Sequence, residues 1–129
     1  MSGVASSANG TLSRNAAGRL APFAVSFLVT CTFFINVCAW FFECGCHALW
    51  AGAALTCNIH SAGVRHCPIC RHGVPGYIAV FALVCAPQLL ASSWPRWNAP
   101  IRLAACLTLF PVAMISVGFV LGWYDGYWR

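Results

Sequence analysis

Residues 20–42 read LAPFAVSFLVTCTFFINVCAWFF, a run of 23 residues without a charged side chain. Arg19 precedes this run and Glu43 follows it. At a rise of about 1.5 Å per residue, a helix of this length reaches roughly 33 Å, whereas the hydrocarbon core of a bilayer is about 30 Å thick. Backbone polar groups in lipid must bond within the protein, so the run predicts a transmembrane helix.

Two further uncharged runs, 73–95 and 103–124, are 23 and 22 residues long. Only 7% of the chain is charged and 60% is hydrophobic, whereas a soluble domain is about 25% charged. Too few charged side chains remain to build a water-soluble surface. The composition therefore predicts an all-α, small polytopic membrane protein with three transmembrane helices. Tryptophan, which favours the lipid–water interface, lies near the ends of the runs, at Trp40, Trp94, Trp97, Trp123 and Trp128.

The three runs divide the chain into seven parts. These are a flexible polar N-terminal tail (1–19), transmembrane helix 1 (20–42), a Cys/His-rich loop (43–72), transmembrane helix 2 (73–95), a short loop (96–102), transmembrane helix 3 (103–124) and a C-terminal tail (125–129). The N-terminal tail and the short loop share one side and hold four arginines, and the other side holds three. Because cytoplasmic segments carry the excess of arginine, we expect a cytoplasmic N-terminus and an extracytoplasmic Cys/His loop.

Polar and small residues inside the spans indicate helix packing. Asn36 and Gln88 are amides at membrane depth, and we expect them to hydrogen-bond between helices. Gly118 and Gly122 form a small-xxx-small motif that predicts contact with another membrane protein or a second copy, in addition to lipid. The span cysteines Cys31, Cys38, Cys85 and Cys106 are interpreted as small apolar packing residues. No basic run indicates a nucleic-acid partner.

The loop between the first two spans concentrates the chemistry of the chain. All four histidines and five of the nine cysteines lie between Cys44 and His72. Zinc prefers four sulfur or nitrogen ligands in a tetrahedron, and closely spaced Cys and His residues suit that requirement. Cys44, Cys46, Cys67 and Cys70 would close the loop at both ends, and Cys57 and His60 would replace one pair or build a second site. The predicted cofactor is zinc or another transition metal, with ligands drawn from Cys44, Cys46, Cys57, His60, Cys67 and Cys70.

The segment Cys67-Pro68-Ile69-Cys70-Arg71 resembles the last cysteine pair of RING-type zinc modules, which often reads Cys-Pro-x-Cys-Arg. The resemblance covers this pair alone. Cys44 and Cys46 are separated by one residue where the RING pattern has two, and no later pair follows. Ubiquitin ligase activity is therefore not carried over, and no family is identified across the whole chain.

Other chemistries of the same loop stay open. Cys67 and Cys70 also have the spacing of a redox-active thiol pair, and a neighbouring Arg71 favours a thiolate. In an extracytoplasmic loop, simple structural disulfides are a further alternative. Covalent c-type haem is disfavoured, because Arg71 stands where Cys-x-x-Cys-His requires histidine.

The acidic residues argue against most enzyme classes. Glu43 and Asp125 are the two carboxylates of the chain, and each lies at the end of a span, so paired-carboxylate catalysis is not expected. We therefore expect a non-enzymatic membrane protein with a structural zinc loop, acting as an accessory, scaffold or small subunit of a membrane complex. The alternatives are a membrane thiol-disulfide oxidoreductase using Cys67 and Cys70, and a copper or zinc handling protein with a labile site.

Overall fold

The structure is a computed structural model, and it describes residues 4–53 and 55–129. Within these ranges the chain forms helices and connecting turns, with no strand. The elements in order are α1 (Val4–Phe42), η1 (Leu49–Ala51), η2 (Asn58–His60), α2 (Pro68–Arg71), α3 (Gly73–Ser93) and α4 (Ala99–Tyr124). The η elements are single 3-10 turns inside the Cys/His loop.

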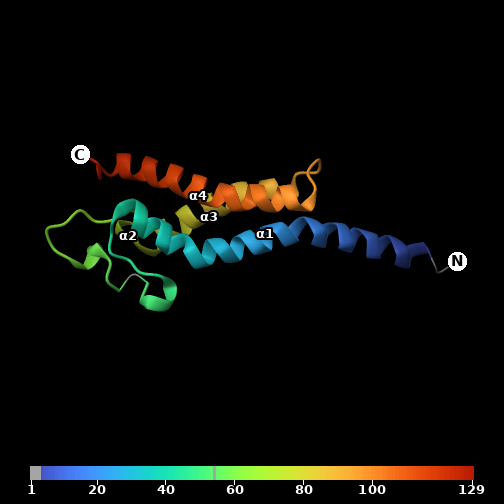
Figure 1. The fold of residues 1–129 in the computed structure, drawn as a ribbon, viewed down its shortest axis with the longest axis horizontal. Helices are drawn as coiled ribbons and strands as arrows, with labels where there is room; N and C mark the ends of the chain where they lie inside the picture. Colours follow the sequence, from blue (N-terminus) through green and yellow to red (C-terminus); the bar gives the residue numbers. More distant parts are fainter. Residues whose placement is uncertain (1–3, 54) are drawn as a thin grey trace.

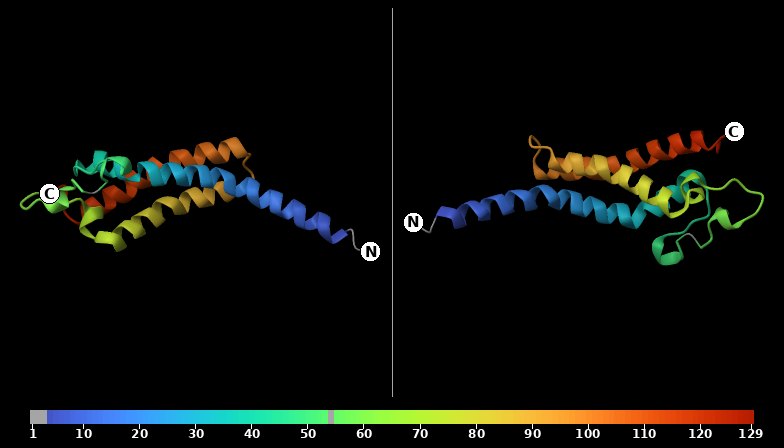
Figure 2. Two further views of the ribbon diagram at one scale, coloured as in Figure 1. Left: turned by 90° about the horizontal axis from the view of Figure 1, so that it is seen from below. Right: turned by 180° about the vertical axis from the view of Figure 1, so that it is seen from behind.

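Three helical stretches are long and apolar enough to cross a membrane, at Ala17–Phe42, Gly73–Ser93 and Ala99–Tyr124. They confirm the prediction of a small all-α protein with three spans, and they indicate a multi-pass membrane protein. Figure 1 shows the three helices lying along one another, with the connection between α3 and α4 at the end toward the N-terminus. The Cys/His loop and the C-terminus lie together at the opposite end (Figure 2).

Helix α1 begins earlier than the sequence suggested. Residues 4–19, which we expected to form a flexible tail, continue the helix from Val4 without interruption, and α1 extends past the other two spans in Figure 1. Once the span is helical, each added residue gains one backbone hydrogen bond without a new nucleation step. Residues 4–19 contain no proline that would prevent such an extension.

A stripe of side chains at every fourth position faces inward from α1. Its buried members are Ser26, Thr30, Phe34, Cys38 and Phe42. Residues four apart lie on one face of a helix, so the polar, aromatic and sulfur members of this stripe meet α3 and α4 at successive depths. In the aromatic layer, the Phe34 ring lies 4.9 Å from the Tyr77 ring and 5.5 Å from the Phe81 ring, both edge-on.

A polar cluster at Gln88, which we call the amide clasp, joins α1 to α3 at membrane depth. Ser26 Oγ donates to Gln88 Oε1 at 2.5 Å, and Gln88 Nε2 donates to Thr30 Oγ1 at 3.1 Å. The same Gln88 nitrogen also donates to the Val84 carbonyl at 3.0 Å. The predicted role of Gln88 between helices is thus confirmed, whereas the buried Oδ1 of Asn36 has no hydrogen-bond partner among the residues that the structure describes.

The two glycines of the small-xxx-small motif pack inside the chain. A Cβ on Gly118 would lie 3.2 Å from the Phe41 ring, and a Cβ on Gly122 would lie 2.5 Å from Trp128 Nε1. Both glycines therefore bring α4 close to the end of α1 and to the C-terminal tail. Contact with a second copy or another protein through them stays a prediction, and it would require Phe41 and Trp128 to move.

The C-terminal residues fasten the loop end of the molecule. Asp125 accepts from or pairs with His72 at 3.0 Å, and Arg65 Nη1 donates to the Tyr127 carbonyl at 2.7 Å. Tyr127 also donates from its hydroxyl to the carbonyl of Phe42, the last residue of α1. The loop, the end of α1 and the start of α3 are thus held together by the five residues after α4.

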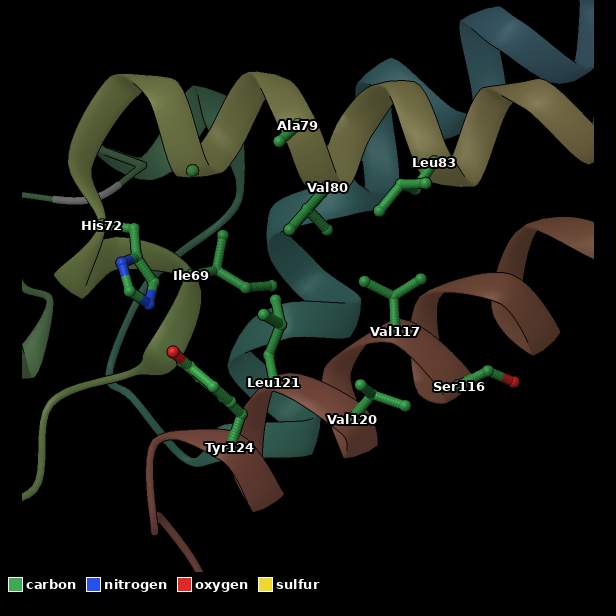
Figure 3. A pocket seen from close by; sticks show the side chains of 11 residues that line it. Ile69, His72, Ala79, Val80, Leu83, Ser116, Val117, Val120, Leu121 and Tyr124 are labelled. Carbon is green, nitrogen blue, oxygen red and sulfur yellow. The ribbon is translucent and has the colours of Figure 1, made fainter.

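An apolar cavity of about 480 Å³ separates α3 from α4 near this end. Figure 3 shows Val80 and Leu83 of α3 facing Val117 and Val120 of α4 across it. His72 lies at its loop end. Direct packing between α3 and α4 is incomplete here. The contacts of the loop therefore contribute more to holding the helices together at this end.

Candidate metal centre

Two groups of three buried cysteines lie under the loop. In the first group, the sulfurs of Cys38, Cys44 and Cys67 lie within 4.8 Å of one another. In the second group, the sulfurs of Cys44, Cys46 and Cys57 satisfy the same limit. Cys44 belongs to both groups, so five cysteines from α1, the loop and the start of α2 form one cluster.

A sixth cysteine completes this cluster. Cys70 lines a small cavity together with Cys38 and Cys46, one from each group. Cys70 is half-buried, whereas the other five thiols are buried. We call the six residues Cys38, Cys44, Cys46, Cys57, Cys67 and Cys70 the sulfur centre.

Sulfur–sulfur distances within the centre suit a shared metal. Cys38 Sγ lies 3.5 Å from Cys67 Sγ, and Cys44 Sγ lies 3.4 Å from Cys46 Sγ. Tetrahedral zinc with bonds of about 2.3 Å to sulfur places its ligands about 3.8 Å apart. A disulfide bond is only about 2.05 Å long, and all nine cysteines are free thiols in this structure. The arrangement is therefore that of metal ligands at slightly short spacing.

The end of α1 turns the chain back so that Cys44 meets Cys38. Helix α1 ends at Phe42, and Glu43 follows with a φ of 48°, in the left-handed region. The reversal brings the Cys44 thiol to 4.0 Å from the Cys38 carbonyl, near the helix end. Gly45 continues the turn with a φ of 75°, and a Cβ there would lie 3.0 Å from the Thr56 carbonyl oxygen. Glycine between the two cysteines is thus required by both backbone conformation and space.

Asn58 ties three parts of the loop together. Its backbone nitrogen donates to the Cys44 carbonyl at 2.8 Å, and its side-chain Oδ1 accepts from the Cys67 nitrogen at 3.2 Å. Its Nδ2 donates to the Arg65 carbonyl at 2.6 Å. One amide beside Cys57 therefore fixes the backbones at Cys44 and Cys67, which belong to different ends of the loop.

The short helix α2 presents the last two cysteines. Pro68 occupies its first turn, where the missing proline N–H costs no hydrogen bond. Cys67 precedes the helix, and the Arg71 nitrogen donates to its carbonyl at 2.8 Å. This single turn brings Cys70 back beside Cys67, which explains the two-residue spacing of the pair.

Hydrogen bonding and burial divide the thiols into two classes. Hydrogen bonds from the thiols of Cys38, Cys44 and Cys70 lower the pKa of Cys67. Burial, followed by a hydrogen bond with Cys57, raises the pKa of Cys46. A hydrogen bond with Cys67, followed by burial, raises the pKa of Cys70. The pKa of Cys67 is thus shifted in the opposite direction to those of Cys46 and Cys70.

The structure brings four of the six predicted ligands together in the two groups, namely Cys44, Cys46, Cys57 and Cys67. Cys70 lies next to them on a cavity that Cys38 and Cys46 also line. The remaining candidate, His60, is exposed and belongs to neither three-cysteine group. Two other histidines have partners elsewhere: His66 Nδ1 lies 3.1 Å from the Asn58 carbonyl, and His72 pairs with Asp125. Both three-residue groups therefore offer sulfur donors.

Cys38 is the member that the sequence did not indicate. It lies inside the first span, where we interpreted cysteine as a packing residue. The structure instead directs its thiol at Cys67, 29 positions further along the chain. The available signal was its place four residues before the end of the span and six before Cys44.

The contacts of Cys44 distinguish a metal site from a set of disulfides. Its thiol interacts with those of Cys38, Cys46 and Cys67. A disulfide uses each cysteine once, so it would satisfy one of these three contacts, whereas a metal ion holds several sulfurs at the same time. The cysteine groups are thus positioned to hold a metal ion.

Comparisons with protein-family models, with curated proteins and with solved structures found no match.

Proposed function

We propose that this chain is a small multi-pass membrane protein whose sulfur centre binds zinc and thereby fixes the loop to the spans. In this role it would act as an accessory, scaffold or small subunit of a membrane complex. The observation that carries the proposal is the meeting of five buried thiols from α1, the loop and the start of α2 in one cluster, with the half-buried Cys70 next to them. Thiolates suit zinc, and an ion held by residues so far apart in sequence would cross-link the loop end.

Burial favours a structural site over an exchanging one. Cys44 and Cys67 are 0% exposed and Cys57 is 1% exposed. A redox-active thiol must reach a partner disulfide, and the attacking sulfur is normally accessible. The lowered pKa of Cys67 would suit an oxidoreductase, but its complete burial does not.

Metal handling is the second candidate. Six sulfur donors suit Cu(I) as well as zinc, and the half-buried Cys70 offers a route by which an ion could enter or leave. A handling protein would release its metal to a competing thiol carrier and change the tolerance of a cell to that metal. A structural site would do neither.

The test is elemental analysis of detergent-purified protein, with free thiols counted on the same sample. At least one zinc per chain, with thiols that react only after denaturation and chelation, is the expected result. Cys44→Ser should lose the zinc, and Cys31→Ala, which alters a span cysteine outside the centre, should keep it. A metal-free protein with an even number of thiols missing would replace this proposal with disulfides.

The variant Cys67→Ser separates the three functions. A structural centre predicts that the variant fails to accumulate in the membrane. An oxidoreductase predicts normal accumulation, lost activity and a mixed disulfide trapped at Cys70. A handling protein predicts normal accumulation and altered metal tolerance. Silence of both Cys67→Ser and Cys70→Ser in all three assays would overturn any functional role for the centre.

A further inference from the structure

The two cysteine groups share one thiol, and each group lacks a fourth ligand. Cys38, Cys44 and Cys67 form one face of a tetrahedron, and Cys44, Cys46 and Cys57 form one face of another. Cys70 lines one small cavity with Cys38 of the first group and Cys46 of the second. The same residue is therefore placed to complete both tetrahedra.

A single zinc ion would leave two of the six thiols without a metal. If it took the first group with Cys70, Cys46 and Cys57 would remain as buried thiols without a metal. If it took the second group with Cys70, Cys38 and Cys67 would remain. The two choices use Cys44 and Cys70 equally, and nothing in the contacts prefers one choice over the other.

We infer that the sulfur centre holds two divalent ions of zinc type, with Cys44 and Cys70 as bridging thiolates. This inference rests on the proposed function, because it specifies how many ions that site takes. Cys38 and Cys67 are the terminal ligands of the first ion, and Cys46 and Cys57 are those of the second. Six thiolates then provide the eight bonds of two tetrahedra that share an edge.

The thiol contacts agree with this assignment. Cys38–Cys67, Cys38–Cys44 and Cys44–Cys67 join sulfurs of the first tetrahedron, and Cys44–Cys46 and Cys46–Cys57 join sulfurs of the second. Each of these contacts therefore links two sulfurs of the same tetrahedron. The cavity that Cys70 lines is also lined by Cys38 and Cys46, one terminal ligand from each side.

A small cavity leaves space for Cys70 to approach the sulfurs of both groups. Closing both tetrahedra requires Cys70 to move toward Cys38 on one side and toward Cys46 on the other. These three cysteines line one cavity of about 60 Å³, so there is space between them into which Cys70 could shift. A void of this size exceeds the minimum of about 10–15 Å³ that even a single water needs.

Charge is also accommodated. Six thiolates exceed the charge of two divalent ions by two, and a bound pair would leave the cluster anionic. Arg65 and Arg71 lie two residues before Cys67 and one residue after Cys70, and both line the same surface pocket beside the centre. These two cations next to the ligands in sequence would offset part of that negative charge.

The first measurement is the zinc content of the reduced, full-length protein after titration with Zn²⁺ and removal of free metal. Two zinc ions per chain are expected. One zinc per chain would overturn the binuclear centre and leave the proposed function intact, whereas no zinc would overturn both. Cys57→Ala should lower the content from two to one, and the control Cys31→Ala should keep two; two retained by Cys57→Ala would also contradict the assignment.

The bridges are tested on the wild-type protein, so the result does not depend on a variant that folds. After replacement of zinc by ¹¹³Cd²⁺, two cadmium resonances are expected in the NMR spectrum. The β-protons of Cys44 and Cys70 should correlate with both resonances, and those of the other four ligands with one each. A single resonance, or cysteines that each correlate with one cadmium only, would overturn the bridging assignment.

Discussion

The amide clasp and the sulfur centre both fasten α1 to later parts of the chain, but they differ in what they need. At the clasp, the Gln88 amide and the hydroxyls of Ser26 and Thr30 supply donors and acceptors that satisfy one another. At the centre, six thiols meet, and thiols are weak hydrogen-bonding groups. The clasp is complete as folded, whereas the centre would become a strong link only if, as we propose, metal replaced the protons of its thiols.

This difference follows from depth. In the hydrocarbon core, an unsatisfied polar group is costly, so the clasp must be self-sufficient. The sulfur centre lies at the loop end, where α3 and α4 are separated by the apolar cavity and the chain is less regular. A cross-link through metal stabilises a segment that has few backbone hydrogen bonds of its own.

Metal removal should produce the largest difference between the sulfur centre and the amide clasp. Chelation under reducing conditions is expected to lower the unfolding midpoint by at least about 10 °C, because structural zinc contributes several kcal/mol or more to small domains. Hydrogen exchange should accelerate around the loop and α2, and remain slow in the segments of α1 and α3 that carry the clasp. Equal acceleration at both places would show that the two links are not independent.

Acid should weaken the centre and leave the clasp unchanged. The raised pKa values of Cys46 and Cys70 mean that both thiols are protonated before metal binds, so binding must displace their protons. For each displaced proton, the apparent zinc dissociation constant should rise about tenfold per unit of falling pH. Zinc retention measured by equilibrium dialysis between pH 8 and pH 5 checks the sign, and a pH-independent constant would contradict it.

Asn58→Ala tests whether the loop scaffold matters to the centre. The variant removes the bonds that this side chain makes to Cys67 and Arg65, so zinc affinity should fall about 10- to 100-fold, the usual effect of losing an outer-sphere contact. Competition with a chelator measures it.

The matched control for Asn58→Ala is Asn98→Ala. Asn98 caps α4 by accepting from the Ile101 nitrogen at the other end of the bundle. Its loss should reduce stability by about 1 kcal/mol without changing zinc affinity. Equal affinities for both variants would remove Asn58 from the scaffold of the centre.

The sequence predicted the spans closely because length and the absence of charge decide them. The expected run 73–95 corresponds to α3 at Gly73–Ser93, and 103–124 lies within α4. The extension of α1 to Val4 was not predictable from hydrophobicity, since the added residues are polar and small. The hydrophobic pattern identifies the part of each helix that must cross the membrane. It does not indicate how far a helix continues beyond the membrane.

The centre was predicted less completely, for a physical reason. Spacing identified the loop cysteines, but not which side chains would converge. That depends on the reversal at Glu43 and Gly45, whose left-handed backbone turns Cys44 back to Cys38. His60 has ligand spacing from Cys57, but it lies on an exposed turn. Spacing along the chain thus indicates which residues could bind a metal. The turn at Glu43 and Gly45 decides which of them lie together.

The smallest effect is expected at the clasp itself. Gln88→Leu removes the interhelical amide and leaves Ser26 Oγ without its described partner, while Thr30 keeps its bond to the Ser26 carbonyl at 2.9 Å. Interhelical hydrogen bonds in membranes contribute about 0.6 kcal/mol on average and up to about 1.7 kcal/mol, so the loss of stability should fall in that range. Thr32→Val, which removes a hydroxyl bonded within α1, is the control. If Gln88→Leu also released zinc, the clasp and the centre would be one cooperative unit. The need for polar groups in the hydrocarbon core to satisfy one another would then not explain why the two links differ.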